Sequence, residues 1–128
     1  GAGMTLDAPI IVSGNLKCEM ISSIADKTVM TLNGPISGSG KITPLNIGQG
    51  SIVNTGVLLL KGDNSEFTGT WDLTQKSTKF LGVDYPTVIE GNVANAFGSG
   101  TINVDQGNSV VFSHERAAGA ELKLNLAG

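Results

Sequence analysis

Four charged side chains in one short stretch could carry acid and base chemistry. Lys61, Asp63, Glu66 and Asp72 lie close together in the sequence. Pairs of carboxyl groups cleave glycosidic bonds when one donates a proton and the other acts as base or nucleophile. An enzyme that degrades polysaccharides is therefore one hypothesis, and it requires these carboxylates to gather on one face of the fold.

The residues that could bind a metal are too few for a known type of site. His114-Glu115 begins like a zinc-protease motif, but Ala118 stands where the second histidine should be, and His114 is the only histidine in the chain. Cys18 is the only cysteine and alternates with Leu16 and Met20, a pattern that favours a buried thiol. We predict no metal site and no cofactor.

A repeated glycine phrase could be mistaken for a phosphate-binding loop. Two glycines one residue apart precede alternating apolar and polar residues at Gly1-Ala2-Gly3, Gly38-Ser39-Gly40, Gly48-Gln49-Gly50 and Gly98-Ser99-Gly100. None continues as a dinucleotide or Walker motif, and the aspartates share no calcium-binding repeat. Each phrase instead predicts a corner followed by a strand.

Composition indicates one β-rich unit. The chain has 128 residues, 18 of them glycine, and a net charge of −3 without any basic cluster. Nucleic acid is therefore an unfavoured partner, and no apolar run approaches the roughly 20 residues that span a bilayer. We treat 1–128 as a single unit.

The elements that would position these residues are short strands bounded by Gly, Asn, Asp or Pro. Strands are predicted at 15–21, 29–32, 41–43, 57–60, 70–73, 87–89, 101–104, 110–112 and 121–126, and Trp71 is expected to pack in the core. Residues 113–120 are expected to form a loop with one helical turn.

Such strands suit either a parallel solenoid or an antiparallel β-sandwich. Asn33-Gly34 and Gly91-Asn92 are the clearer hairpin candidates, but most strands are separated by longer or Gly-x-Gly segments. The pattern therefore favours the solenoid and leaves the sandwich as the alternative.

Three segments, in order, resemble a known repeat. Residues 33–43 resemble the opening phrase of the autotransporter-associated β-strand repeat, residues 56–70 resemble its apolar strand and turns, and residues 95–104 match its closing phrase. The resemblance covers about 33–113, and it departs from the repeat at 44–55, an inserted phrase, and at 75–86, a longer polar connection.

The resemblance implies a right-handed, single-stranded parallel β-helix of short rungs, as in the passenger regions of bacterial autotransporters. It places Asp63 and Asn64 in a turn, where short polar side chains bond to the backbone. Because a rung cannot bury its apolar face alone, it also implies that the ends of 1–128 meet adjoining rungs of a longer passenger or other copies of the chain.

We therefore expect a non-catalytic stalk, adhesin or self-association module, secreted or held at the bacterial cell surface with the outer membrane. A host-surface protein or glycan is a further candidate partner. The connection at 76–86 is the candidate recognition loop, with Lys76, Lys79, Asp84 and Tyr85 as its contact residues. Two alternatives stay open: a polysaccharide-degrading β-helix such as a phage tailspike fragment, and a carbohydrate-binding β-sandwich.

Overall fold

The chain coils into rungs whose strands stack in parallel sheets. The computed structural model describes residues 3–21, 28–47, 56–75, 86–119 and 121–127. Two five-stranded sheets and one two-stranded sheet form within these residues, and every strand pair there is parallel. The predicted parallel β-helix is confirmed, and the antiparallel sandwich is excluded.

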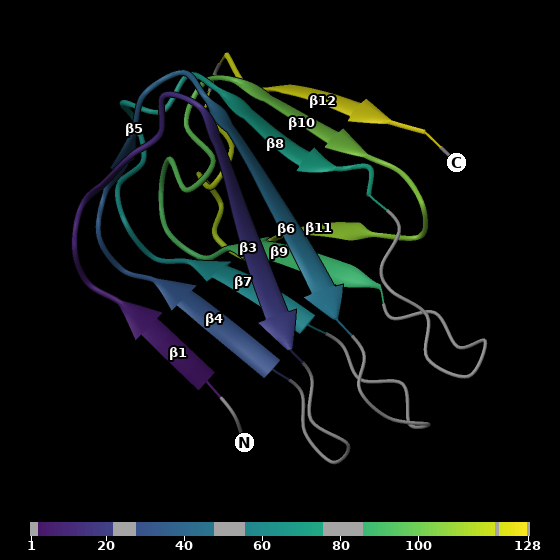
Figure 1. Ribbon diagram of the computed structural model, residues 1–128. Coiled ribbons are helices and arrows are strands. Elements are labelled where there is room, and N and C mark those ends of the chain that lie inside the picture. The colour runs from purple at the N-terminus through teal and green to yellow at the C-terminus, as the bar shows by residue number, and fades with distance from the viewer. Residues whose placement is uncertain (1–2, 22–27, 48–55, 76–85, 120, 128) are drawn as a thin grey trace, which may run out of the picture.

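Each rung contributes one strand to each of the larger sheets, as the chain path in Figure 1 shows. Sheet I contains β1 (Gly3–Leu6), β4 (Thr28–Leu32), β7 (Gly56–Leu60), β9 (Thr87–Gly91) and β11 (Ser109–Phe112). Sheet II contains β3 (Asn15–Ile21), β6 (Lys41–Ile47), β8 (Thr70–Leu73), β10 (Thr101–Val104) and β12 (Lys123–Leu126). Sheet III pairs β2 (Ile10–Ile11) with β5 (Ile36–Ser37).

The strand predictions are confirmed wherever the structure describes the residues, with differences of one to four residues at several strand ends. The last strand begins at Lys123 rather than at residue 121, and β6 continues past Thr43 to Ile47. Pro44 lies in this extension, beyond the two residue pairs that join β6 to β8. A residue without an N–H is tolerated there because the ladder on that side has ended.

The core is a set of side-chain columns that run from rung to rung. In sheet I the register aligns Met4, Met30, Leu58, Ile89 and Val110. In sheet II it aligns Leu16, Ile42, Trp71, Ile102 and Leu124. Inside the stack these side chains are buried, whereas Met4 and Leu124 at its ends are exposed.

Aromatic rings strengthen the core toward its C-terminal end. Phe67, Trp71, Phe97 and Phe112 make successive edge-to-face contacts, with ring centroids 5.1, 6.0 and 5.0 Å apart. Trp71 is fully buried, as predicted, and its indole N–H donates to the carbonyl oxygen of Phe97 at 2.8 Å.

The two hairpin predictions are wrong, because both segments are corners within a rung. Asn33 N–H donates to the Leu6 carbonyl at 2.9 Å, and Asn92 N–H donates to the Leu60 carbonyl at 3.2 Å, so the parallel ladder continues past each strand. Gly91 belongs to β9, where an added Cβ would lie 2.4 Å from the Phe97 ring. This glycine makes room for an aromatic side chain.

The repeated glycine phrase does form corners that lead into strands. Gly38 (φ 104°) and Gly98 (φ 71°) take the positive φ that favours glycine, and β6 and β10 begin directly after Gly40 and Gly100. Gly3 differs, because it is the first residue of a sheet I strand. The phrase at 48–50 lies outside the described residues.

The second glycine of the phrase belongs to a column in which neighbouring rungs touch through their backbones. A Cβ on Gly40 would lie 2.2 Å from the Gly14 carbonyl oxygen, on Gly69 1.9 Å from that of Gly40, and on Gly100 1.7 Å from that of Gly69. The same oxygens accept hydrogen bonds from the strand that follows in the next rung. The rungs can therefore keep their spacing only without a side chain here.

We predict that Gly100→Ala lowers the free energy of unfolding by about 3 kcal/mol, since its Cβ would overlap a backbone oxygen that cannot move without breaking the ladder. Gly14→Ala is the matched control: its Cβ would meet nothing within 4 Å, so we expect a change within about 0.5 kcal/mol. Urea unfolding followed by circular dichroism measures both, and equal effects would contradict the backbone-contact explanation.

A buried asparagine connects three rungs at the corner between sheets I and II. Asn64 is 0% exposed. Its side-chain oxygen accepts from Ile36 N–H at 2.7 Å, and its side-chain nitrogen donates to the Ala96 carbonyl at 2.6 Å. The amide therefore takes the place of a peptide group where the backbone leaves the regular ladder.

Asn64→Ala should cost about 2–4 kcal/mol of folding free energy, because it leaves a buried N–H and a buried carbonyl without partners. Asn125→Ala removes an exposed bond to Asn103 and should change stability by less than about 0.5 kcal/mol. Urea midpoints of the two variants make the comparison, and an Asn64→Ala protein as stable as Asn125→Ala would rule out this role.

Candidate functional site

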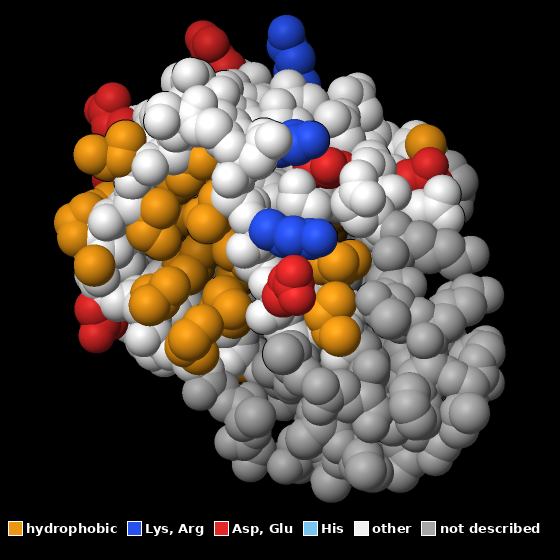
Figure 2. All heavy atoms as spheres, viewed as in Figure 1, with side chains coloured by type: hydrophobic (Ala, Val, Ile, Leu, Met, Phe, Trp, Pro, Cys, Tyr) orange, Lys and Arg blue, Asp and Glu red, His pale blue; other side chains and the backbone are white. Residues whose placement is uncertain are grey.

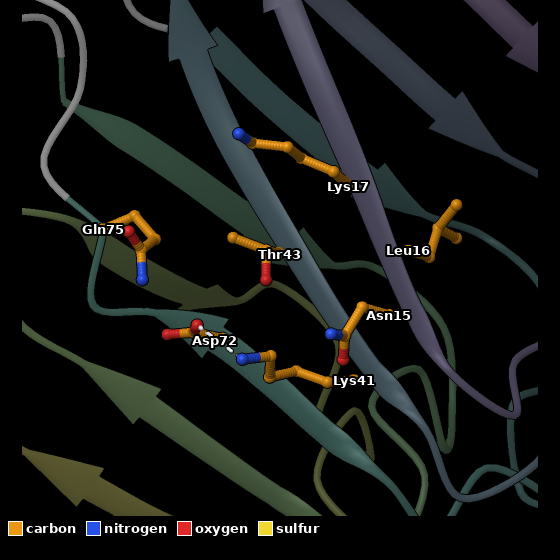
Figure 3. A pocket seen from close by; sticks show the side chains of 7 residues that line it. All are labelled: Asn15, Leu16, Lys17, Lys41, Thr43, Asp72 and Gln75. Carbon is orange, nitrogen blue, oxygen red and sulfur yellow. Dashed lines mark ion pairs between the residues drawn. The ribbon is translucent and has the colours of Figure 1, made fainter.

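A shallow pocket lies on the outer face of sheet II. Its volume is about 210 Å³, and Figure 3 shows side chains from β3, β6 and β8 around it. The lining residues are Asn15, Leu16, Lys17, Lys41, Thr43, Asp72 and Gln75. Apart from Leu16, which belongs to the inward column of sheet II, the strand residues that meet here point outward from three stacked rungs.

An ion pair occupies one side of this pocket. Lys41 Nζ lies 3.7 Å from Asp72 Oδ2, and the Asp72 side chain is largely buried while that of Lys41 remains half exposed. The Asp72 carboxylate also accepts hydrogen bonds from the backbone N–H and the hydroxyl of Thr74. The carboxylate is thus already satisfied by its own rung and by the rung before it.

The electrostatics of Asp72 favour its charged form. Burial by itself would raise the pKa of this carboxyl, but the hydrogen bonds from Thr74 and the charge of Lys41 outweigh it and hold the pKa below its usual value. A general acid at neutral pH needs the opposite shift. The geometry suits a structural anion better than a proton donor.

The other carboxylates of the sequence-based enzyme hypothesis serve different parts of the fold. Asp63 accepts a hydrogen bond from Ser65 N–H at 3.1 Å, the local contact of a turn. Glu66 precedes Phe67, which forms a parallel bridge with Gly38 directly after β5 of sheet III. Asp72 belongs instead to sheet II. The turn interpretation of Asp63 is confirmed.

The single histidine lies in the turn between β11 and β12. Ala117 N–H donates to the His114 carbonyl at 3.1 Å, and His114 Nδ1 accepts from Arg116 N–H at 3.0 Å. The described residues 113–119 thus contain a hydrogen-bonded turn but not the helical turn that was expected. Among the residues that the structure describes, no three His, Cys, Asp or Glu side chains are grouped so that they could hold a metal ion.

Cys18 lies on the inner side of β3, as its alternation with Leu16 and Met20 predicted. It is buried, and burial raises the pKa of its thiol to about 11. A thiol with so high a pKa is almost wholly protonated at neutral pH, so Cys18 contributes as a small apolar side chain.

The candidate recognition loop falls in a part of the chain that lies outside the described residues. Lys76, Lys79, Asp84 and Tyr85 all belong to the segment between Gln75 and Pro86. The structure places the two residues that flank this segment: Gln75 lines the pocket on sheet II, and the carbonyl of Pro86 accepts a hydrogen bond from the Asn46 side chain. The loop remains a prediction.

Sequence reasoning missed the buried polar group where sheet II leads into the next rung of sheet I. Asn108 donates from its side chain to the carbonyls of Leu73 and Gln75 and accepts from Thr87 N–H at 2.9 Å. Thr87 in turn accepts from Asn46 N–H through its hydroxyl at 2.8 Å. No spacing signal could reveal this set, because its members come from rungs joined by connections of unequal length.

Comparison of the chain with protein-family models, with curated proteins and with solved structures gave no match. Within the described residues, no helix is long and apolar enough to cross a membrane. The resemblance to the autotransporter-associated repeat therefore stands on the sequence phrases alone.

The lowered pKa of Asp72 predicts a contribution to acid sensitivity. A carboxyl whose pKa is lower in the folded state stabilises fully above its unfolded value of about 3.9, and this contribution is lost as the pH falls through the folded value. Asp72→Asn should therefore lose less thermal stability than the wild type when the pH is lowered from neutral into that range.

Thermal unfolding followed by circular dichroism across this pH range measures the effect. Asp63→Asn is the matched control, because it removes the same charge from an exposed turn. If the two variants show the same pH dependence, the ion pair and the Thr74 bonds do not stabilise the folded carboxylate.

Proposed function

We propose that this chain is a non-catalytic structural segment of an exported bacterial surface protein, serving as a stalk, adhesion or self-association module. The observation that carries the proposal is the stack itself, in which the inward columns run through all the rungs of two five-stranded parallel sheets. Such a stack is a rigid spacer whose length grows with each rung.

The outer surface supports a structural role. The Asp72 carboxylate is held by Lys41 and Thr74 and kept charged, and Asp63 completes a turn. Groups committed to the fold in this way are poorly placed to transfer protons to a substrate. The sequence phrases at 33–43, 56–70 and 95–104 resemble passenger regions, and this resemblance supports a location at the cell surface.

Surface location is the test of this proposal. An antiserum raised against the purified chain should label intact cells of the source organism, and treating the intact cells with protease should remove the label while a cytosolic marker stays protected. Antigen that becomes accessible only after lysis would contradict the proposal.

The alternative function, a polysaccharide-degrading β-helix, is tested by an activity assay. The purified chain should leave the viscosity and the reducing-end content of acidic polysaccharides unchanged. Cleavage that disappears in Asp72→Asn would favour a polysaccharide-degrading β-helix instead.

A further inference from the structure

One corner of the coil carries a residue pair whose side chain and backbone can react with each other. Asn33-Gly34 follows β4, and Asn33 is exposed to solvent. The side-chain carbonyl carbon of an asparagine can be attacked by the backbone nitrogen of the next residue. Glycine permits this approach best, because it has no Cβ beside the attacking nitrogen. The corner therefore holds the pair of groups that deamidation requires.

The attacking nitrogen at this corner lies outside the hydrogen-bond ladder. The N–H groups around it are bonded, that of Asn33 to the Leu6 carbonyl at 2.9 Å and that of Ile36 to the Asn64 side chain at 2.7 Å. Within the part of the chain that the structure describes, Gly34 N–H donates to no acceptor. An unpaired N–H is rare in a folded backbone. Here it means that no ladder bond has to break before the nitrogen reacts.

The leaving group is positioned by the rung before it. Asn33 Nδ2 donates to Asp7 Oδ1 at 2.8 Å, and both side chains are exposed. The bond holds the amide at the surface, where water reaches it. It also shows what deamidation would remove, because the donor would be replaced by a carboxylate oxygen that can only accept.

We propose that Asn33 is a site of spontaneous deamidation. The Gly34 nitrogen forms a bond to Cγ of Asn33 and gives up its proton, while the Cγ–Nδ2 bond breaks and the amide nitrogen leaves as ammonia with that proton. Water then adds across one of the two ring C–N bonds of the resulting imide. The product at position 33 is aspartate or isoaspartate, according to which bond opens.

The corner has no room for the longer main chain of isoaspartate. A Cβ on Gly34 would lie 2.3 Å from the Ala8 carbonyl oxygen, and a Cβ on Gly62 would lie 2.3 Å from the Gly34 carbonyl oxygen. The backbone of Gly34 is thus enclosed by the rungs before and after it. Isoaspartate places one more carbon in the main chain, and a segment packed on both sides can lengthen only by displacing a neighbour.

The aspartate product keeps the backbone path but changes the charges beside it. Asp7, Asn33 and Lys61 follow β1, β4 and β7, so they hold equivalent positions in successive rungs. A carboxylate at position 33 would face Asp7, the group that the amide contacts now, with Lys61 in the rung beyond. On the face that Figure 2 shows, acidic side chains are scattered singly. Adjoining carboxylates repel each other, so the contact with Asp7 turns from attractive to repulsive.

The chain contains an internal control for the reaction rate. Asn92 follows β9, two rungs later, and its N–H donates to the Leu60 carbonyl as that of Asn33 donates to Leu6. The next residue is Val93, whose branched side chain hinders attack by its own nitrogen. Deamidation should therefore be on the order of tenfold faster or more at position 33 than at position 92.

The rate is measured on the purified, folded chain during storage in mildly alkaline buffer. Peptide mapping by mass spectrometry should show the exchange of NH₂ for OH at position 33, and a protein isoaspartate methyltransferase should label the same peptide. Asn33→Gln is the matched control, because it keeps an exposed amide but would have to close a larger ring. This variant should stay unmodified at position 33, and circular dichroism checks that it is folded.

The effect on the fold is measured with substitutions that mimic the aspartate product. Asn33→Asp should lower the midpoint of thermal unfolding by about 2–5 °C, because it replaces a hydrogen bond by repulsion at an exposed corner. Adding Asp7→Asn restores one donor and one acceptor and should recover most of this loss. Asn92→Asp places the same charge one rung after Lys61 and should cause no decrease.

Three outcomes would overturn the inference. Equal rates at positions 33 and 92 would show that the glycine gives no advantage in the folded coil. Modification of position 33 only in urea would show that the packed corner protects Asn33. An Asn33→Asp protein as stable as the wild type would show that the charge at Asp7 does not matter.

Discussion

The hydrogen bonds between the backbones of successive rungs determine the rest of this structure. Because the strands of sheets I and II pair with those of neighbouring rungs, the position of each side chain in these sheets is fixed by the one beneath it. The ladder even crosses a corner: Thr70 N–H donates to Gly40, and Thr101 N–H donates to Gly69, at 3.0 Å each. A corner bonded this closely excludes a Cβ, which is why the glycine phrase recurs where it does.

Where the backbone leaves the regular ladder of hydrogen bonds, short polar side chains supply the missing donors and acceptors. Asn64 supplies an acceptor and a donor at one corner, and Asn108 does the same at another. An asparagine amide carries the groups of a peptide bond, so it can satisfy the neighbouring rungs while the main chain turns away. Rungs joined by connections of different length can thus share one continuous core.

Alternation and glycine positions predicted most strands and favoured a parallel coil over a sandwich, because both express the local geometry of a rung. They were insufficient for the corners at Asn33-Gly34 and Gly91-Asn92, since the same residue types suit a hairpin and a solenoid corner. The Lys41–Asp72 pair was equally hidden. The pair depends on the register between rungs. This register cannot be read from a fixed spacing in the sequence, because the connections between rungs differ in length.

The asymmetry of the core gives the coil a direction beyond that of its strands. Aromatic side chains fill the later rungs up to Phe112, whereas Met4, Leu6 and Leu16 leave the first rung hollow. The packing between rungs therefore changes along the described coil, from aliphatic side chains in the first rung to edge-to-face aromatic contacts in the later ones.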